Sequence, residues 1–153
     1  MPRILLPVLV FFCALPLSTF AATIYVNSST GNDATGTGAS AAPYATFYKG
    51  YTSAVANDTL DLTGTFDWSN AAETGDASGS GYTLGKSLTI LGQGATATFI
   101  QASSTENTAD RRVFTISTGQ TVTIKNITVR YGVSTATESG GGITNSGNLN
   151  LQN

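Results

Sequence analysis

The chain has 153 residues, 7 basic against 9 acidic side chains, a formal net charge of −2 and no histidine. Charges this sparse exclude the basic surface that nucleic-acid binding requires and a polybasic patch for a membrane surface. Small polar residues are abundant, yet apolar and polar residues alternate regularly from residue 60 onward. This alternation indicates a folded β protein rather than a disordered chain.

Residues 1–21 have the form of a secretory signal peptide. Arg3 supplies the positive start, Ile4 to Leu17 is the apolar segment, and Thr19 to Ala21 fits a cleavage site. The apolar run is interrupted by prolines and is shorter than the roughly 20 residues that span a bilayer. Cys13, the only cysteine, lies in this segment, so the mature chain would have no disulfide. We therefore predict export, to the outside or to the cell surface or outer membrane, with no membrane span in the mature part.

Residues 22–58 are predicted to form an N-terminal cap, which begins with a strand and a loop. Ala22 to Asn27 alternates and is rich in β-branched and aromatic residues, as strands are. The loop of residues 28–43 contains Asp33 among glycines and other oxygen donors, which makes calcium binding conceivable. Because it lacks the spaced acidic ligands of known calcium loops, Asp33 is only a weak candidate ligand. We predict a structural loop and no metal or cofactor.

The cap is predicted to continue as a short helix over Ala45 to Ala56, which begins near Pro43. Phe47, Tyr51 and Val55 would form its apolar stripe at the spacing of successive helical turns. A helix at this place would cover the strand edge and the core that the first coil of a repetitive fold leaves open.

Residues 59–153 repeat a short pattern: apolar, polar, apolar, any residue, then Gly or Asn. The copies begin at Leu60, Leu88, Val122 and Leu149. A short strand at a period that drifts between about 27 and 34 residues predicts a solenoid with one coil per repeat. Each coil has room for about three short strands, which favours a three-sided parallel β-helix over an antiparallel β-sandwich.

Alignment of the copies predicts a ladder of stacked side chains. Parallel strands stack at about 4.8 Å, so like residues should lie over like. The pattern predicts one inward column of Leu60, Leu88, Val122 and Leu149, and a second of Leu62, Ile90, Ile124 and Leu151. Asp61, Thr89 and Thr123 should point outward. A turn column is expected at Gly64, Gly92, Asn126 and Asn153, because Gly and Asn tolerate a left-handed backbone.

Four side chains are candidates for ligand binding. Trp68 would stack on a sugar ring if exposed, although an aromatic residue at this place more often packs under the helix. Arg111 and Arg112 precede a strand and could grip an acidic polysaccharide, or simply solvate a loop. Arg130 is the only base in a strand-like position.

No catalytic constellation is visible in the repeats. Hydrolysis of a polysaccharide would require clustered carboxylates on one outward face. Asp61 is the only acidic residue in the aligned columns. We therefore predict no catalytic residue in this segment.

The repeats, the opening Tyr25 to Asn27 and the segment Gly140 to Asn153 resemble the right-handed parallel β-helix (pectin-lyase-like) superfamily. Gly140 to Ile143 also resembles half of the polymorphic outer-membrane protein repeat found in adhesin-type proteins. The resemblance implies an all-β, right-handed, three-sided parallel β-helix of about three coils with a short N-terminal capping helix. The superfamily includes polysaccharide lyases, hydrolases and adhesins, so the fold does not decide the function.

We expect the N-terminal part of an exported, adhesin-like binding scaffold for an extracellular polysaccharide or a ligand on a host or cell surface. The alternative is the N-terminal part of a secreted polysaccharide lyase or glycoside hydrolase whose active coils lie beyond residue 153. Both assume that the coils continue, because the sequence ends on a repeat without a visible cap. Whether the full-length protein is an enzyme stays open.

Overall fold

The computed structural model describes residues 20–77, 79–134 and 140–153, and it is mostly β with one short helix. Most of the predicted signal peptide lies outside the described residues. Within the described part, no helix is both long and apolar enough to cross a membrane.

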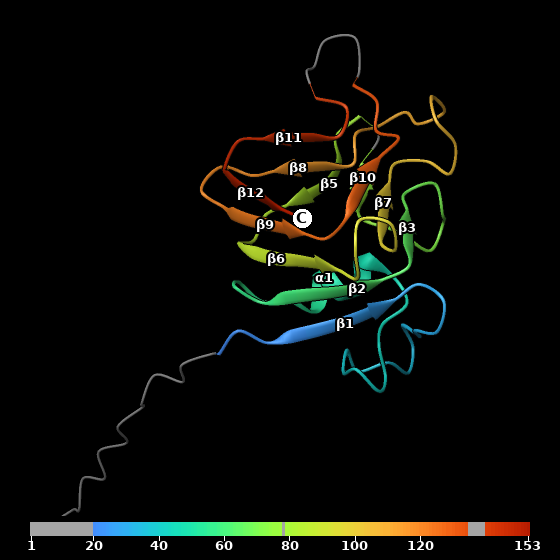
Figure 1. The fold of residues 1–153 in the computed structure, drawn as a ribbon, viewed down its shortest axis with the longest axis vertical. Helices are drawn as coiled ribbons and strands as arrows, with labels where there is room; N and C mark the ends of the chain where they lie inside the picture. The colour runs from blue at the N-terminus through green and yellow to red at the C-terminus, as the bar shows by residue number, and fades with distance from the viewer. Residues whose placement is uncertain (1–19, 78, 135–139) are drawn as a thin grey trace, which may run out of the picture.

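The strands belong to three sheets (Figure 1). The five-stranded sheet contains β1 (Thr23–Asn27), β2 (Thr59–Thr63), β6 (Leu88–Gly92), β9 (Thr121–Lys125) and β12 (Asn148–Gln152). The three-stranded sheet contains β3 (Thr65–Asp67), β7 (Phe99–Gln101) and β10 (Thr128–Arg130). The four-stranded sheet contains β4 (Asp76–Ala77), β5 (Gly81–Leu84), β8 (Phe114–Ile116) and β11 (Ile143–Asn145).

From β2 onward, the chain visits the five-stranded, the three-stranded and the four-stranded sheet in turn and then returns to the first. All named pairings in these sheets are parallel except that of β4 with β5. The predicted all-β class with parallel strands is confirmed. An antiparallel β-sandwich is contradicted by this pairing.

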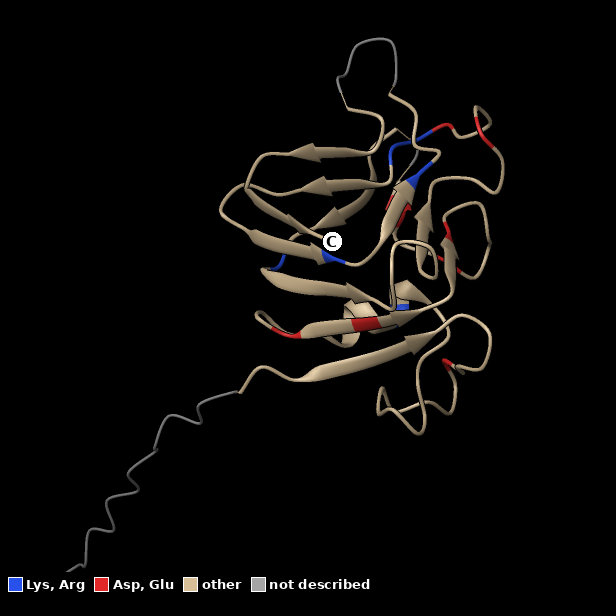
Figure 2. Ribbon diagram, in the orientation of Figure 1, with Lys and Arg blue, Asp and Glu red and all other residues tan. Residues whose placement is uncertain are grey.

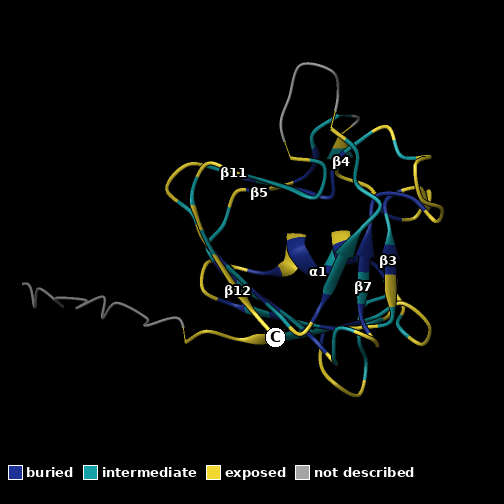
Figure 3. Cartoon of the chain, turned by 45° about the horizontal axis from the view of Figure 1, so that its top comes forward, coloured by how far each residue is buried: buried dark blue, intermediate teal, exposed yellow. Residues whose placement is uncertain are grey.

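Side chains alternate inward and outward along each strand, as the pattern predicts. In β2, Leu60 and Leu62 are fully buried, whereas Asp61 between them is partly exposed. The three sheets surround the core, as the burial colours of Figure 3 show. The largest fully buried side chains come from every sheet and from the helix, and include Phe47, Leu60, Phe66, Leu84, Ile90, Ile100, Phe114 and Ile116.

The predicted ladder is right for the later circuits of the chain. Leu88, Val122 and Leu149 stack, and so do Ile90, Ile124 and Leu151. The turn column is also in register here, because the residues just before Gly92, Asn126 and Asn153 pair with one another. Asn126 has φ of 54°, in the left-handed region that Asn tolerates.

The predicted register between β2 and β6 is wrong by two residues. Leu60 pairs with Ile90 rather than Leu88, and Leu62 pairs with Gly92. A shift of two residues keeps every side chain on the same face, so an alternating pattern cannot distinguish the two registers. Thr59 consequently replaces Asp61 in the outward column.

The predicted turn column is also wrong at Gly64, because Leu62 rather than Gly64 lies opposite Gly92. The carbonyl oxygen of Gly64 instead accepts the N–H of Phe99, the first residue of β7.

The helix α1 (Phe47–Ser53) is shorter than predicted at both ends. Thr46, not Pro43, begins it, because the Thr46 hydroxyl accepts the N–H of Lys49 at 3.0 Å. At its end, the Lys86 ammonium donates to the carbonyl oxygens of Tyr51 and Ala54, each at 2.8 Å. These bonds satisfy carbonyls that a helix terminus leaves free. Val55, predicted to belong to the stripe, lies outside the helix and is 53% exposed.

Helix α1 lies inside the ring of sheets at the N-terminal end of the stack (Figure 3). The ring of Phe47 lies 5.4 Å from that of Trp68, 4.9 Å from that of Tyr82 and 5.7 Å from that of Phe114, centre to centre. The helix therefore packs over the N-terminal end of the core through a cluster of aromatic rings. This is the position predicted for it from the sequence.

Candidate functional site

Three long loops lie at one corner of the molecule, where the three-stranded sheet gives way to the four-stranded sheet (Figure 1). They span residues 68–80, which include the two-residue strand β4, and residues 102–113 and 131–142, apart from residues 78 and 135–139, which the structure does not describe. We call these loops, with the strand ends Asp67, Gln101 and Arg130, the loop corner. Loops on a rigid scaffold are the usual place of binding and catalytic residues.

The loop corner also holds many of the described charged residues, whereas those in the rest of the ribbon are few and scattered (Figure 2). These charged residues are Asp67, Glu73, Asp76, Glu106, Asp110, Arg111, Arg112 and Arg130. The few charged residues of the sequence are therefore concentrated at the loop corner of the folded chain.

The strand ends form a hydrogen-bonded polar column. Asp67, Gln101 and Arg130 are neighbours in register on β3, β7 and β10. The Nε2 of Gln101 donates to Oδ2 of Asp67 at 2.8 Å, and the Nε of Arg130 donates to Oε1 of Gln101 at 2.8 Å. Such a column links a carboxylate to a guanidinium group through one amide and holds all three side chains in place.

Two aromatic rings fix the orientation of Arg130. Its guanidinium carbon lies 4.2 Å from the ring centre of Phe99 and 4.7 Å from that of Tyr131. Tyr131 has φ of 59°, an uncommon conformation for a bulky residue that costs about 1–3 kcal/mol. Among the described residues, the two Nη groups of Arg130 have no hydrogen-bond partner. An arginine held in this way presents a planar fork of donors to a carboxylate.

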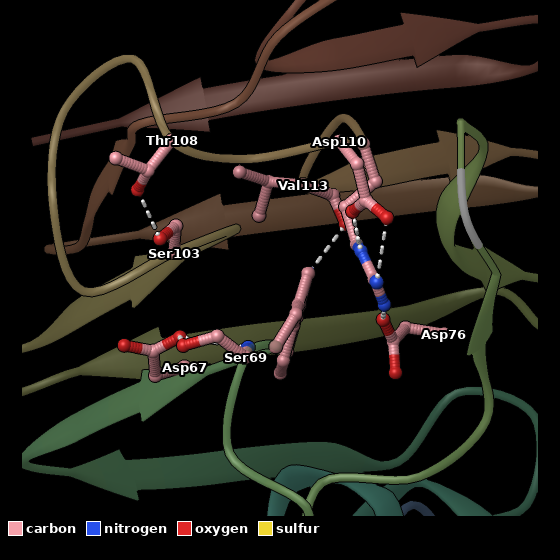
Figure 4. Close-up of polar contacts among 9 residues, drawn as sticks. Asp67, Ser69, Asp76, Ser103, Thr108, Asp110 and Val113 are labelled. Atoms are coloured by element: carbon pink, nitrogen blue, oxygen red, sulfur yellow. Dashed lines mark hydrogen bonds and ion pairs between the residues drawn. The ribbon is translucent and has the colours of Figure 1, made fainter.

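Arg111 fastens the loops to one another. Its Nη1 pairs with Asp76 in the first loop, and its Nε donates to Oδ1 of Asp110 at 2.5 Å (Figure 4 labels both aspartates). The bond with Asp110, helped by Asp76 and opposed by partial burial, raises the pKa of Arg111. The carbonyl oxygen of Arg111 accepts the N–H of Val133 in the third loop at 2.9 Å. The predicted ligand-binding residue is thus engaged within the protein.

Arg112 and Trp68 are buried, although the sequence offers both as binding residues. Arg112 is 4% exposed, and its Nη1 contacts the hydroxyl of Thr144 on β11. Trp68 is 3% exposed, and its Nε1 donates to the carbonyl oxygen of Val113 at 2.8 Å. Trp68 therefore cannot stack on a sugar, and the interpretation that it packs beneath the helix fits its contacts. Arg130, by contrast, is partly exposed, and its two Nη groups have no hydrogen-bond partner among the described residues.

Asp33 has a structural role in the cap. Its carboxylate accepts the N–H groups of Ala45 and Thr46 at 2.7 and 3.1 Å, and the hydroxyl of Thr46 at 2.6 Å. The described residues contain no group of three or more His, Cys, Asp or Glu side chains able to hold a metal ion. Asp33 is therefore committed to the turn that precedes α1.

Glu73, in the first loop, has no counterpart among the sequence-based candidates. It is 6% exposed, and its two carboxylate oxygens accept the N–H groups of Phe47 and Tyr48 at 2.9 and 3.1 Å. Burial raises the pKa of Glu73 to about 7, against the effect of these two bonds and with smaller contributions from Asp33 and Asp76. The sequence has no signal for this, because Glu73 stands in a stretch of small and polar residues that reads as a solvated loop.

The column of Asp67 and Gln101 is also absent from the sequence-based predictions. Only the pairing of strands from different circuits brings these residues to Arg130.

Comparisons with family models, curated proteins and solved structures find no match. The candidate site therefore rests on its own geometry.

Proposed function

We propose that this chain belongs to a right-handed, three-sided parallel β-helix and acts as an exported binding scaffold of the adhesin type. Parallel pairing within each sheet and the repeated visit to three sheets support the fold. The predicted signal peptide supports export. The resemblance to the pectin-lyase-like superfamily agrees with both and belongs to the same proposal.

The observation that carries the binding function is the concentration of loops and charge at the loop corner, which includes Arg130 at the end of β10. The stacked strands supply a rigid support, and the loops vary in length without disturbing it. The two Nη groups of Arg130, which have no partner among the described residues, suit a carboxylate. We therefore propose an acidic extracellular polysaccharide, or an acidic group on a cell surface, as the ligand.

The test is binding of the complete protein to immobilised acidic polysaccharides, with neutral polysaccharides as a reference. Arg130→Gln should weaken binding at least about tenfold, the effect of losing roughly 1.5–3 kcal/mol from a hydrogen bond to a charged group. Lys125→Gln is the matched control, because Lys125 is a partly exposed base on β9, on another sheet. Equal binding by Arg130→Gln and the unaltered protein would refute the site.

The alternative, a polysaccharide lyase or glycoside hydrolase, has one observation in its favour, the presence of Asp67, Asp76 and Asp110 at the same corner. However, Asp76 and Asp110 both pair with Arg111, and Asp67 receives bonds from Gln101 and from Ser69, the latter at 2.6 Å (Figure 4). Carboxylates engaged in this way hold loops in place. Unsaturated products or new reducing ends in the same binding assay would favour the enzyme over the scaffold.

A further inference from the structure

The first loop of the loop corner is fastened to helix α1 by one buried carboxylate. Glu73 accepts the N–H groups of Phe47 and Tyr48, which stand in the first turn of the helix and have no partner within it. Glu73 lies 26 residues from Phe47 in the chain. The contact therefore joins two separate segments, the cap and the loop corner.

The surroundings of Glu73 are acidic. Asp33, in the loop before the helix, and Asp76, on β4, both disfavour its charged form. Asp76 is itself paired with Arg111 from the second loop. Tyrosines also lie close by, namely Tyr82 on β5 and Tyr48 and Tyr51 on the helix. The pKa of Tyr82 is raised by burial first and then by Glu73, Tyr51, Tyr48 and Asp76.

We propose that Glu73 is a proton-responsive clasp, which holds the first loop closed on α1 when it binds a proton and loosens when it loses the proton. Protonation leaves one full acceptor oxygen and weakens one of the two bonds to the helix N–H groups, but it removes a buried negative charge that Asp33 and Asp76 both disfavour. The inference concerns the fold itself and does not depend on the proposed function.

The direction follows from the difference in proton binding between the closed and open forms. The closed loop raises the pKa of Glu73 from its ordinary value of 4.5 to about 7. Opening exposes the carboxyl group to water and restores the ordinary value. Between these two pH values the closed form binds more protons, so acidification favours it. Over the whole window, the ratio of closed to open forms changes by at most about 300-fold.

The chain contains a natural probe for this clasp. Trp68 is its single tryptophan, stands five residues before Glu73 in the same segment, and packs on the ring of Phe47 at 5.4 Å. Loosening of the loop should change the fluorescence of Trp68 and increase hydrogen exchange at the amides of Phe47 and Tyr48.

The experiment follows both signals from pH 4.5 to pH 8, with exchange rates corrected for the pH dependence of an unstructured peptide. We expect protection of the two amides to fall as the pH rises through the window and to level off above about 7. Glu73→Gln, which stays neutral, should abolish this change. Glu106→Gln removes an exposed glutamate from the second loop and should leave the profile of the unaltered protein.

Carbon NMR of the side-chain carboxyl group of Glu73 gives a second readout, measured on the unaltered protein. The variant Glu73→Gln serves only to assign the signal. A titration midpoint near 7 supports the clasp. A midpoint near 4.5, or an amide-protection profile that Glu73→Gln leaves unchanged, overturns it.

Discussion

The two ends of the stack differ in how they treat their core. At the N-terminal end, α1 packs Phe47 against aromatic rings from the four-stranded sheet and from the loop that follows β3, and the loop of residues 38–44 bonds to the outer edge of β1. At the other end, Leu151 is 66% exposed beside a hollow of about 410 Å³. Ile124, Ile127, Val129 and Ile143 also line that hollow. The same side-chain pattern is therefore buried at one end and open at the other.

The comparison shows that the repeat does not bury a residue by itself. Leu60 and Leu151 belong to one column, which runs through Ile90 and Ile124. Leu60 is fully buried because β1 and α1 pack on its side of the stack. Leu151 repeats the pattern without a strand beyond it in the described chain. A side chain in this column is thus buried only where another strand or a helix packs over it.

The largest effect is expected from placing a charge at each end of this column. Leu60→Asp would bury an unpaired carboxylate at a cost above about 5 kcal/mol, comparable with the whole stability of a domain. We expect the variant to be unfolded. Leu151→Asp places the same charge at an exposed position and should change the free energy of unfolding by less than about 1 kcal/mol. Circular dichroism and urea unfolding of the two variants would test this, and equal effects would remove the distinction between the ends.

A second prediction concerns the aromatic cluster beneath the helix. Phe47→Ala should destabilise the fold by about 3–5 kcal/mol, because it leaves a cavity among buried rings. Val55→Ala, only two residues beyond the helix and 53% exposed, is the control and should cost less than about 0.5 kcal/mol. Urea unfolding followed by the fluorescence of Trp68 measures both. A small effect of Phe47→Ala would show that the helix is not needed to close this end.

Gly50 gives a third test of how tightly the helix fits. A β-carbon at Gly50 would lie 2.5 Å from Cγ2 of Val26 on β1. Although alanine favours helices by about 1 kcal/mol over glycine, the clash should dominate. We expect Gly50→Ala to destabilise by about 1–3 kcal/mol. Ser53→Ala, at an exposed position of the same helix, should be neutral or slightly stabilising. Stabilisation by Gly50→Ala would indicate a looser cap than the contacts imply.

The smallest effect is expected at the turn of Asn126, in the circuit next to the open end. Asn126 has φ of 54°, in the left-handed region, which asparagine tolerates but which strains most other residues with a β-carbon. Asn126→Ala should lower the free energy of unfolding by about 1 kcal/mol, whereas Asn126→Gly should change it by less than about 0.5 kcal/mol. Thermal unfolding of the pair checks the order. A tolerated alanine would show that the left-handed backbone at this position does not require asparagine or glycine.

The sequence predicts those parts of this molecule that repeat. The strands, their alternation and the later ladder follow from a pattern with period two. The place of the helix follows from a different signal, the apolar stripe at the spacing of helical turns. The register of β2 does not follow, because Leu62 opposite Gly92 and Leu62 opposite Ile90 give the same inward face.

The candidate site is predicted only in part, because its residues meet through different circuits. Arg130 is visible in the sequence as a base in a strand, but its partner Gln101 is 29 residues away. Glu73 accepts a bond from Phe47 on the helix, which lies 26 residues before it. The residues around Arg130 or Glu73 in the sequence do not indicate these contacts, because the partners lie in other segments of the chain.

The contact of Phe47 with Phe114 has a consequence for the order in which the chain acquires its structure. Phe47 cannot complete its packing until β5 and β8, which lie far later in the sequence, have been synthesised. During synthesis from the N-terminus, the apolar face of α1 would therefore stay exposed while the roughly 60 residues up to Phe114 are made. The helix that covers this end of the core emerges well before the strands that complete its packing.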